Sequence, residues 1–166
     1  MLVLSIVGAT MITQWEGLEE TAYKDLAGIT TIGVGSTYLP VGTEYMLDDK
    51  TYIAKSKTKV IMGMRLTSSE AKRIAIDEAE KTFGKGAVGK CISAPINQNE
   101  YDAYTSLAYN IGPKAFCAST LVKMVNLKRY AEGCKQLLRW TYSNGKYVRG
   151  LYNRRSEEFR LCMKND

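Results

Sequence analysis

The sequence predicts an α+β fold, mainly α, with a small N-terminal α/β lobe, a connecting helix and a larger helical C-terminal lobe. Three patterns lead to this prediction: apolar residues at helical spacing near the N-terminus, a short stretch rich in glycine and β-branched residues, and repeated helix signals from Asn97 onward. A length of 166 residues is the size of one domain. We therefore expect a single domain, with the N-terminal helix and β lobe over residues 1–66, the connecting helix over 67–90 and the helical lobe over 91–166.

The first predicted element is a helix close to the N-terminus. No side chain from Met1 to Gln14 is charged, and Ser5 is a candidate N-cap. An alternative is that this segment is the tail of a longer export or anchor sequence. The run is too short to cross a bilayer and lacks the basic start of a secretory signal. We favour the helix because apolar residues recur at helical spacing: Leu4, Val7, Met11, Ile12 and Trp15.

The next elements are β structure and the connecting helix. Residues 26–37 predict a short hairpin with tight turns, because they are rich in glycine and β-branched residues. Residues 38–64 are mixed and indicate an irregular loop or a further β element. Thr67 and Glu70 form a capping-box pattern, in which Thr67 caps a helix and Glu70 reaches back. The following stretch to Phe83 is charged, which is typical of an exposed helix.

From Asn97 the pattern is helical. Asn97 and Glu100 form another helix start, and an apolar stripe follows before Gly112 and Pro113 end the helix. The next helix starts at Ser119 or Thr120, and both remain open. Further elements are a helix to Trp140, a turn over 143–145 and a last helix from about Asn153 to Met163. The apolar stripe of the first of these helices consists of Tyr104, Leu107, Ala108 and Ile111.

The formal net charge of +6 is unevenly placed. Residues 1–113 carry 11 Lys and Arg against 13 Asp and Glu, whereas residues 114–166 carry 12 against 4. A basic C-terminal third favours a polyanionic partner, such as nucleic acid, an anionic membrane surface or peptidoglycan, whose stem peptides carry carboxylates. The basic residues are scattered over predicted helices, so we interpret them as a solvated face that approaches an anionic wall. We expect no nucleic-acid partner and no stable membrane span.

The absence of histidine narrows the chemistry. It excludes Ser-His-Asp and Cys-His catalysis and every histidine-based metal site. The four cysteines are widely spaced without a CxxC motif, which disfavours a zinc cage, so we expect no metal and no cofactor. Four cysteines allow three disulfide connectivities, or all four are free buried thiols. The spacing does not choose between these alternatives.

Carboxylates are then the groups on which hydrolysis can depend, and glycoside hydrolysis commonly needs only two. One must be protonated near neutral pH, which apolar surroundings favour, and the other must be ionised. Glu16, after Trp15 at the end of the first predicted helix, fits the acid, and Asp25, at the mouth of the glycine-rich turn, fits the second role. Thr31 in the predicted hairpin has a hydroxyl that can hold a water opposite Glu16. The plain alternatives are a solvated helix-end glutamate and an ordinary turn aspartate.

Several blocks of the sequence, taken in order, match one family pattern. The first blocks are Trp15–Leu18, Ala22–Asp25, Gly28 and Thr31–Gly35. The later blocks are Asn97–Gly112, Phe116–Leu121 with Asn126, Arg139–Trp140, and Gly150–Arg155 with Glu158. This pattern, which covers most of the chain outside residues 38–66, resembles that of phage-type lysozymes, the endolysin muramidases of bacteriophages.

The resemblance implies a lysozyme-like fold and hydrolysis of the β-1,4 bond between N-acetylmuramic acid and N-acetylglucosamine in peptidoglycan, for host cell lysis. It implies that Glu16 is the acid and that Asp25 and Thr31 handle water and charge on the opposite face. It also implies inversion at the anomeric carbon, and retention through Asp25 is the alternative that the separation of the two carboxyl groups decides. It also implies a monomer that is made in the bacterial host cytoplasm and acts on the cell wall in the periplasm. A non-catalytic peptidoglycan-binding module on the same scaffold is the alternative, since a fold does not determine a function.

Family similarity also suggests substrate-binding residues in a cleft between the lobes. Tyr109, Asn110 and Thr120 are the candidates, although Tyr109 is equally suited to the core and Thr120 to capping a helix. Arg154 and Arg155 would form a salt bridge near the catalytic acid or be solvated.

The resemblance implies disulfides as well. Cysteines in corresponding places imply a bridge between Cys134 and Cys162, and a second between Cys91 and Cys117. Such bridges suit a periplasmic site of action.

Two departures from the family pattern stand out. Residues 38–64 are longer and richer in Tyr and Lys than the usual connection, which puts the substrate reach of this region in doubt. Ile6 stands where the family often has an acidic residue, just after the start of the first helix.

Overall fold

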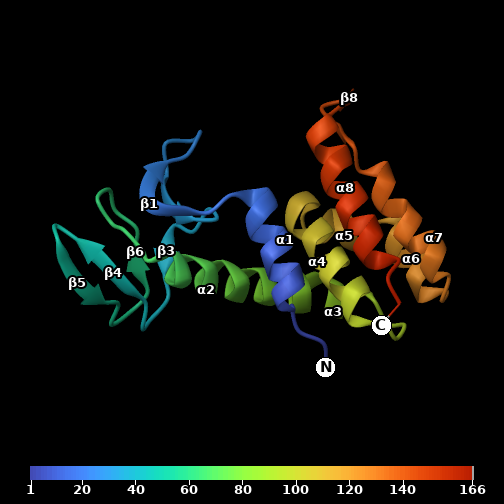
Figure 1. Cartoon of the computed structure of the whole chain (residues 1–166), viewed down its shortest axis with the longest axis horizontal. Helices are drawn as coiled ribbons and strands as arrows, with labels where there is room; N and C mark the ends of the chain where they lie inside the picture. Colours follow the sequence, from blue (N-terminus) through green and yellow to red (C-terminus); the bar gives the residue numbers. More distant parts are fainter. Residues whose placement is uncertain (166) are drawn as a thin grey trace. The chain divides into compact units, whose positions relative to one another are not determined.

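The computed structural model describes residues 1–165, which form two compact units (Figure 1). The smaller unit is residues 13–77, and the larger unit is residues 1–12 together with residues 78–166. Helices account for most of the regular structure, and short antiparallel strand pairs account for the rest. The predicted α+β class, mainly α, is confirmed.

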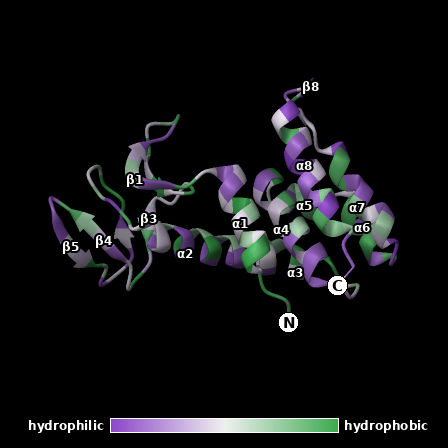
Figure 2. Ribbon diagram, in the orientation of Figure 1, coloured by the Kyte–Doolittle hydropathy of each residue, from purple (hydrophilic) through white to green (hydrophobic). Residues whose placement is uncertain are grey.

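Helix α1 (Ile6–Glu16) begins as predicted. Ser5 caps it, because Ser5 Oγ accepts hydrogen bonds from the amides of Val7 (3.1 Å) and Gly8 (3.3 Å). The chain leading into α1 is hydrophobic (Figure 2). Val7 was expected in the buried stripe but is 56% exposed. The buried face of α1 passes instead through Gly8, Ala9, Met11 and Ile12.

The strands of the smaller unit form three antiparallel pairs. The pair β1–β2 is the predicted hairpin, but its first strand lies before the predicted range of residues 26–37. The prediction missed this strand because Ala22 is its one buried residue, so the sequence shows no apolar alternation there. Residues 38–64 form β structure, one of the two predicted alternatives. The strands are β1 (Glu19–Lys24), β2 (Thr30–Gly33), β3 (Tyr38–Leu39), β4 (Glu44–Leu47), β5 (Lys50–Ile53) and β6 (Thr58–Lys59), with β3 paired to β6 and β4 to β5.

Helix α2 (Ser68–Ala79) closes the core of the smaller unit. Thr67 caps it as predicted, accepting from the Glu70 amide at 3.2 Å. The reciprocal half of the predicted capping box is wrong, because the Glu70 carboxylate accepts from the amide of Glu44 and from Arg73. The core that α2 completes consists of Ala22, Ile32, Leu39, Val60, Met64, Leu66, Ala71 and Ile74.

The larger unit is built around α4 (Gln98–Ile111), which packs against α8 (Arg149–Cys162) and against the π-helix η1 (Glu80–Val88) (Figure 1). The predicted capping box of Asn97 and Glu100 is confirmed, since each side chain accepts from the other residue's amide. α8 begins four residues before the expected Asn153. The remaining elements are α3 (Gly89–Cys91), α5 (Pro113–Cys117), α6 (Thr120–Asn126), α7 (Tyr130–Gln136), η2 (Leu137–Arg139), β7 (Tyr142–Ser143) and β8 (Lys146–Tyr147).

Two smaller expectations are resolved in this unit. Ser119, and not Thr120, caps α6, because its hydroxyl accepts from the Val122 amide at 3.3 Å. The turn predicted over 143–145 connects β7 and β8, and Asn144 and Gly145 both take the left-handed conformation that such a tight turn requires. Within residues 1–165, no helix is both long enough and apolar enough to cross a membrane.

Candidate active site

Glu16 is the last residue of α1 and is half-buried. Gly17 follows with a φ of 76°, a left-handed conformation that ends the helix and that glycine adopts without steric cost. The chain then enters β1. This arrangement places a carboxyl group at the junction between a helix and a hairpin.

The Glu16 side chain lines a pocket of about 320 Å³ in the smaller unit. The hairpin builds the rest of the pocket, because antiparallel pairing sets Glu19 on β1 opposite Gly33 on β2. The pocket therefore contains two carboxylates and one phenol among small residues. Its lining is Glu16, Gly17, Glu19, Tyr23, Gly33, Val34 and Gly35.

Asp25 organises the turn of this hairpin. Its Oδ1 accepts hydrogen bonds from the amides of Ala27 (2.9 Å) and Ile29 (2.8 Å), and Gly28 donates to the Asp25 carbonyl at 2.9 Å. These are the contacts of an Asx-type turn. Asp25 accepts both of these hydrogen bonds through Oδ1, so Oδ2 keeps its acceptor capacity. Asp25 does not line the Glu16 pocket.

Thr31 lies on β2, directly opposite Tyr23 in the ladder. Its side chain is buried, with 3% of its surface exposed, and its hydroxyl lies 3.5 Å from the Tyr23 carbonyl. Asp25 and Thr31 therefore lie on the same hairpin as the pocket residues but do not line the pocket. The polar side chains that line it together with Glu16 are those of Glu19 and Tyr23.

Glu19 is the pocket residue that sequence reasoning missed. Nothing local distinguishes it from its neighbour Glu20, and both are exposed strand residues. The signal lies in the pairing, because the register between β1 and β2 brings Glu19 to Gly33. Sequence periodicity does not report that register when the strand has a single buried residue.

The candidate substrate-binding residues of the larger unit occupy different surroundings. Tyr109 is half-buried, with its ring centroid 4.5 Å from that of Phe83 on η1, and Asn110 is exposed at the end of α4. Thr120 lines a second pocket of about 470 Å³, where a hydroxyl, an amide, a guanidinium and an indole come together. Its lining is Ala115, Ala118, Ser119, Thr120, Leu121, Gln136, Arg139 and Trp140.

Arg154 and Arg155 are not solvated. Both are buried in α8, with 4% and 0% of their surface exposed, and both pair with Glu158, which is also fully buried. The distances are 3.2 Å from Arg154 Nε to Glu158 Oε1 and 2.9 Å from Arg155 Nε to Glu158 Oε2. Ser106 of α4 donates to Glu158 Oε1 at 2.6 Å, and Arg154 donates to the Ser106 carbonyl at 3.1 Å. These residues join α8 to α4, which explains why α8 is coloured largely hydrophilic although it is packed (Figure 2).

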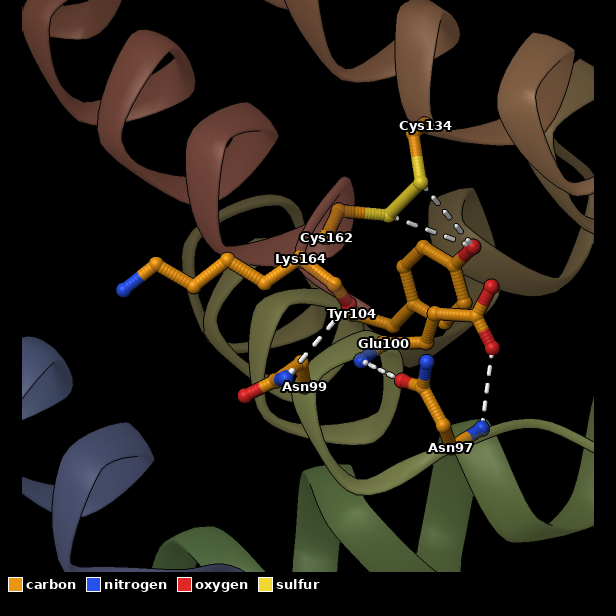
Figure 3. The surroundings of a disulfide bond; sticks show 7 residues. All are labelled: Asn97, Asn99, Glu100, Tyr104, Cys134, Cys162 and Lys164. Atoms are coloured by element: carbon orange, nitrogen blue, oxygen red, sulfur yellow. Dashed lines mark hydrogen bonds between the residues drawn. A yellow bond between two sulfur atoms is a disulfide. The ribbon is translucent and has the colours of Figure 1, made fainter. Parts of the chain in front are cut away.

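Both disulfides of the structure lie in the larger unit. Cys91 is bonded to Cys117 and Cys134 to Cys162, which are the pairings that the family resemblance implies. Tyr104 points its hydroxyl at the second bridge, 3.4 Å from Cys162 Sγ and 3.9 Å from Cys134 Sγ (Figure 3). Burial, and then the charge of Glu100, raises the pKa of Tyr104 far above its ordinary value. The phenol therefore remains a donor beside the sulfur atoms.

No group of three or more Asp, Glu or Cys side chains in residues 1–165 is arranged to hold a metal ion. The chemistry available in the pocket is that of carboxylates and a phenol.

Comparison with known proteins agrees with this geometry. Residues 13–158 match the family model described as phage lysozyme. The chain is 32% identical over 140 residues to the endolysin of Salmonella phage P22, covering 84% of each protein. It is 33% identical over 153 residues to the SAR-endolysin of Pseudomonas phage phiKMV, covering 90% of this chain and 81% of the relative. A crystal structure of a P22 lysozyme mutant superimposes with a TM-score of 0.80 at 31% identity, over 99% of this chain and 100% of that one.

Proposed function

Because the chain belongs to the phage lysozyme family, we propose that Glu16 is the general acid with which it cleaves the glycan strand of peptidoglycan. The chain is a peptidoglycan-hydrolysing endolysin, a muramidase among the glycoside hydrolases. The observation that supports the assignment is the position of Glu16 at the end of α1, lining the pocket that the β1–β2 hairpin completes. A carboxylic acid there can donate its proton to the leaving oxygen of the glycosidic bond.

Asp25 and Thr31 are proposed to act on the other side of the bond. Asp25 Oδ2 has acceptor capacity to orient a water or to stabilise positive charge on the sugar, while Oδ1 holds the turn rigid. Thr31 would assist from the neighbouring strand. We further propose cleavage of the β-1,4 bond between N-acetylmuramic acid and N-acetylglucosamine with inversion at the anomeric carbon, because an orienting carboxylate leaves room for water to attack directly.

Tyr109, Asn110 and Thr120 are proposed to contact the substrate. The support is strongest for Thr120, whose pocket also contains Gln136, Arg139 and Trp140. This set offers donors for carboxylates and carbonyl groups and an aromatic face for a sugar ring. We further propose that the enzyme is a monomer without a nucleic-acid partner, made in the host cytoplasm and acting on the wall in the periplasm.

The test is release of reducing ends from purified peptidoglycan. Glu16→Gln keeps the shape of the side chain but cannot donate a proton, so we expect turnover to fall by about 10²–10⁴-fold with an unchanged circular dichroism spectrum. Glu20→Gln, which lies on β1 next to the pocket but outside it, is the matched control and should retain wild-type turnover. Proton NMR of the first products of the wild-type reaction should show the α-anomer.

Full activity in Glu16→Gln would remove Glu16 as the acid. Binding to the wall without any release of reducing ends, by the wild type, would support the non-catalytic alternative. A β-anomer as the first product would assign retention, with a carboxylate as nucleophile in place of one that orients water.

A further inference from the structure

The region that departs from the family pattern has an unusual charge distribution. From Lys50 to Ser69 the chain contains five basic side chains and no carboxylate, although the smaller unit as a whole contains both signs. Large apolar side chains are exposed in and beside the same stretch, where an ordinary solvated surface would carry polar ones. The five basic residues are Lys50, Lys55, Lys57, Lys59 and Arg65.

Backbone pairing gathers part of this region at one end of the β4–β5 hairpin. The ladder continues past the strand ends, because the Ala54 amide donates to the Thr43 carbonyl (2.9 Å) and the Gly42 amide donates to the Ala54 carbonyl (2.8 Å). Val41, which precedes Gly42, therefore lies near Ala54 and the loop that follows it. This end of the hairpin lies opposite the turn at 48–49.

The loop from β5 to β6 adds an aromatic ring and cations at the same place. Lys57 Nζ lies 4.6 Å from the centre of the Tyr38 ring, and Tyr38 is paired with Lys59 in the β3–β6 ladder. Lys55 stands between Ile53 and Lys57 in the chain. We define the Val41 patch as Tyr38, Val41, Ile53, Lys55, Lys57 and Lys59.

The side chains of the Val41 patch are open to solvent. Val41 is 66% exposed, Ile53 62% and Tyr38 44%, and the three lysines are exposed as well. Glu44 is opposite Ile53 in the ladder, and the Glu70 carboxylate, which accepts from the Glu44 amide, is neutralised by its pairing with Arg73. Three cations against one anion leave the patch positively charged.

We propose that the Val41 patch binds the surface of an anionic phospholipid bilayer. Lysines approach the anionic headgroups, aliphatic side chains enter the boundary of the acyl chains, and a tyrosine ring is suited to the interface between the two. The exposed aliphatic side chains of Val41 and Ile53 favour a lipid surface over an anionic saccharide as the ligand. A hydrated polysaccharide gives two exposed aliphatic side chains no apolar medium to enter, whereas a bilayer does. The binding is peripheral and independent of the reaction at Glu16.

The test is sedimentation of the full chain with vesicles of phosphatidylcholine containing phosphatidylglycerol, compared with phosphatidylcholine alone. We expect binding to the anionic vesicles that weakens at high salt. Each lysine replaced by glutamine in the patch should lower the partition coefficient about fivefold, so that the triple variant Lys55→Gln, Lys57→Gln, Lys59→Gln loses about two orders of magnitude. Val41→Thr with Ile53→Thr keeps the charges and β-branching and should also weaken binding.

Lys50→Gln is the matched control. It removes the same charge from the same hairpin, but at the end next to Asp48 and Asp49, and it should change the partition coefficient less than twofold. All variants should hydrolyse lipid-free purified peptidoglycan at the wild-type rate, so a failure here is distinguishable from a failure of the Glu16 assignment.

Three results would overturn the proposal. Wild-type vesicle binding by the triple lysine variant or by the double threonine variant would show that the patch is not the contact. An equal loss in Lys50→Gln would show a response to net charge alone. A variant that keeps vesicle binding but loses binding to purified peptidoglycan would identify the patch as a glycan site.

Discussion

At Gly8 the backbone of α1 approaches Asp102 of α4 so closely that a side chain has no room. A β-carbon at this position would stand 2.7 Å from the Asp102 carboxyl carbon. Asp102 is itself held in place, because it accepts from the Ser5 amide at 3.0 Å, from the Ser5 hydroxyl and from Gln98 Nε2 at 2.9 Å. The contact therefore ties the start of α1 to α4.

Gly8→Ala should consequently destabilise the larger unit although alanine favours helix formation. The β-carbon must displace Asp102 from its hydrogen bonds, and we expect a loss of about 1–3 kcal/mol in the free energy of unfolding, measured by denaturant titration. Gly150→Ala is the control, because a β-carbon there meets nothing within 4 Å and the helix propensity of alanine should be neutral or stabilising. Equal stability of Gly8→Ala and wild type would show that the contact is not tight in solution.

Residues whose role depends on neighbours in the chain were predictable, and residues whose role depends on distant partners were not. The caps at Ser5 and Asn97 follow from local patterns and are confirmed. For Arg154 and Arg155 the sequence left open a salt bridge near the acid or solvation, and solvation is wrong because both side chains are buried. Their burial depends on Ser106, which is about 50 positions away, and a partner at that separation leaves no mark on local periodicity.

The pairing of α4 with α8 depends on the buried ions of α8. The Glu158 carboxylate pairs with both Arg154 and Arg155 in a buried environment. An exposed pair elsewhere in the structure allows a comparison. Arg129, the N-cap residue of α7, and Glu132 form the same i, i+3 pair as Arg155 and Glu158, but with side chains 50% and 48% exposed. Burial is the variable that differs between the two pairs.

Glu158→Gln should therefore cost about 3–5 kcal/mol of unfolding free energy, because two buried guanidinium groups lose the carboxylate with which both pair. Glu132→Gln should cost less than about 1 kcal/mol, since water solvates the released Arg129. Thermal and denaturant unfolding of the two variants measures the difference. A cost below 1 kcal/mol for both would mean that the buried ions do not hold α8 against α4.

Among the elements, those with an apolar stripe were predictable and those without one were not. The limits of α4 follow from a cap, a stripe and a Gly-Pro stop. Strand β1 has one buried residue, so its sequence does not differ from that of an exposed loop, and the predicted hairpin begins too late. The start of α8 was placed late for a related reason, because Arg149 and Gly150 show neither a cap nor an apolar position.

On the scale of the molecule, the two disulfides differ in how easily a reductant reaches them. Cys134 and Cys162 are buried, with 1% and 3% of their surface exposed, while Cys91 and Cys117 are half-buried. A mild phosphine reductant should open the Cys91–Cys117 bridge first, and alkylation followed by mass spectrometry identifies the reduced pair. Simultaneous reduction of both bridges in the folded protein would contradict this order.

Reduction should also weaken one unit and spare the other. The sequence separations of 26 and 28 residues correspond to about 3.5 kcal/mol of unfolding free energy for each bridge. Residues 13–77 contain no cysteine, and each unit has one tryptophan, Trp15 in the smaller and Trp140 in the larger. After reduction, the fluorescence of Trp140 in a Trp15→Phe variant should report a lowered unfolding temperature. Trp15 in a Trp140→Phe variant should report little change.

The grouping of residues 1–12 with residues 78–166 is beyond what sequence patterning reports. It depends on contacts such as Leu4 with Glu80 and Ser5 with Asp102, which are 76 and 97 positions apart. Local patterns describe elements, and their assignment to a unit requires such long-range contacts.

The same discontinuity sets an order of events during translation. Residues 1–12 leave the ribosome before residues 13–77, and their partners Glu80, Gln98 and Asp102 are synthesised later than both. Residues 13–77 have their own core and emerge as one uninterrupted piece. They can therefore fold before the partners of residues 1–12 have been synthesised. The helix that ends in Glu16 is then completed only late in synthesis, since pairings across long stretches of chain form slowly. A nascent chain therefore exposes its apolar N-terminal segment for most of its time on the ribosome, during which chaperones can bind it.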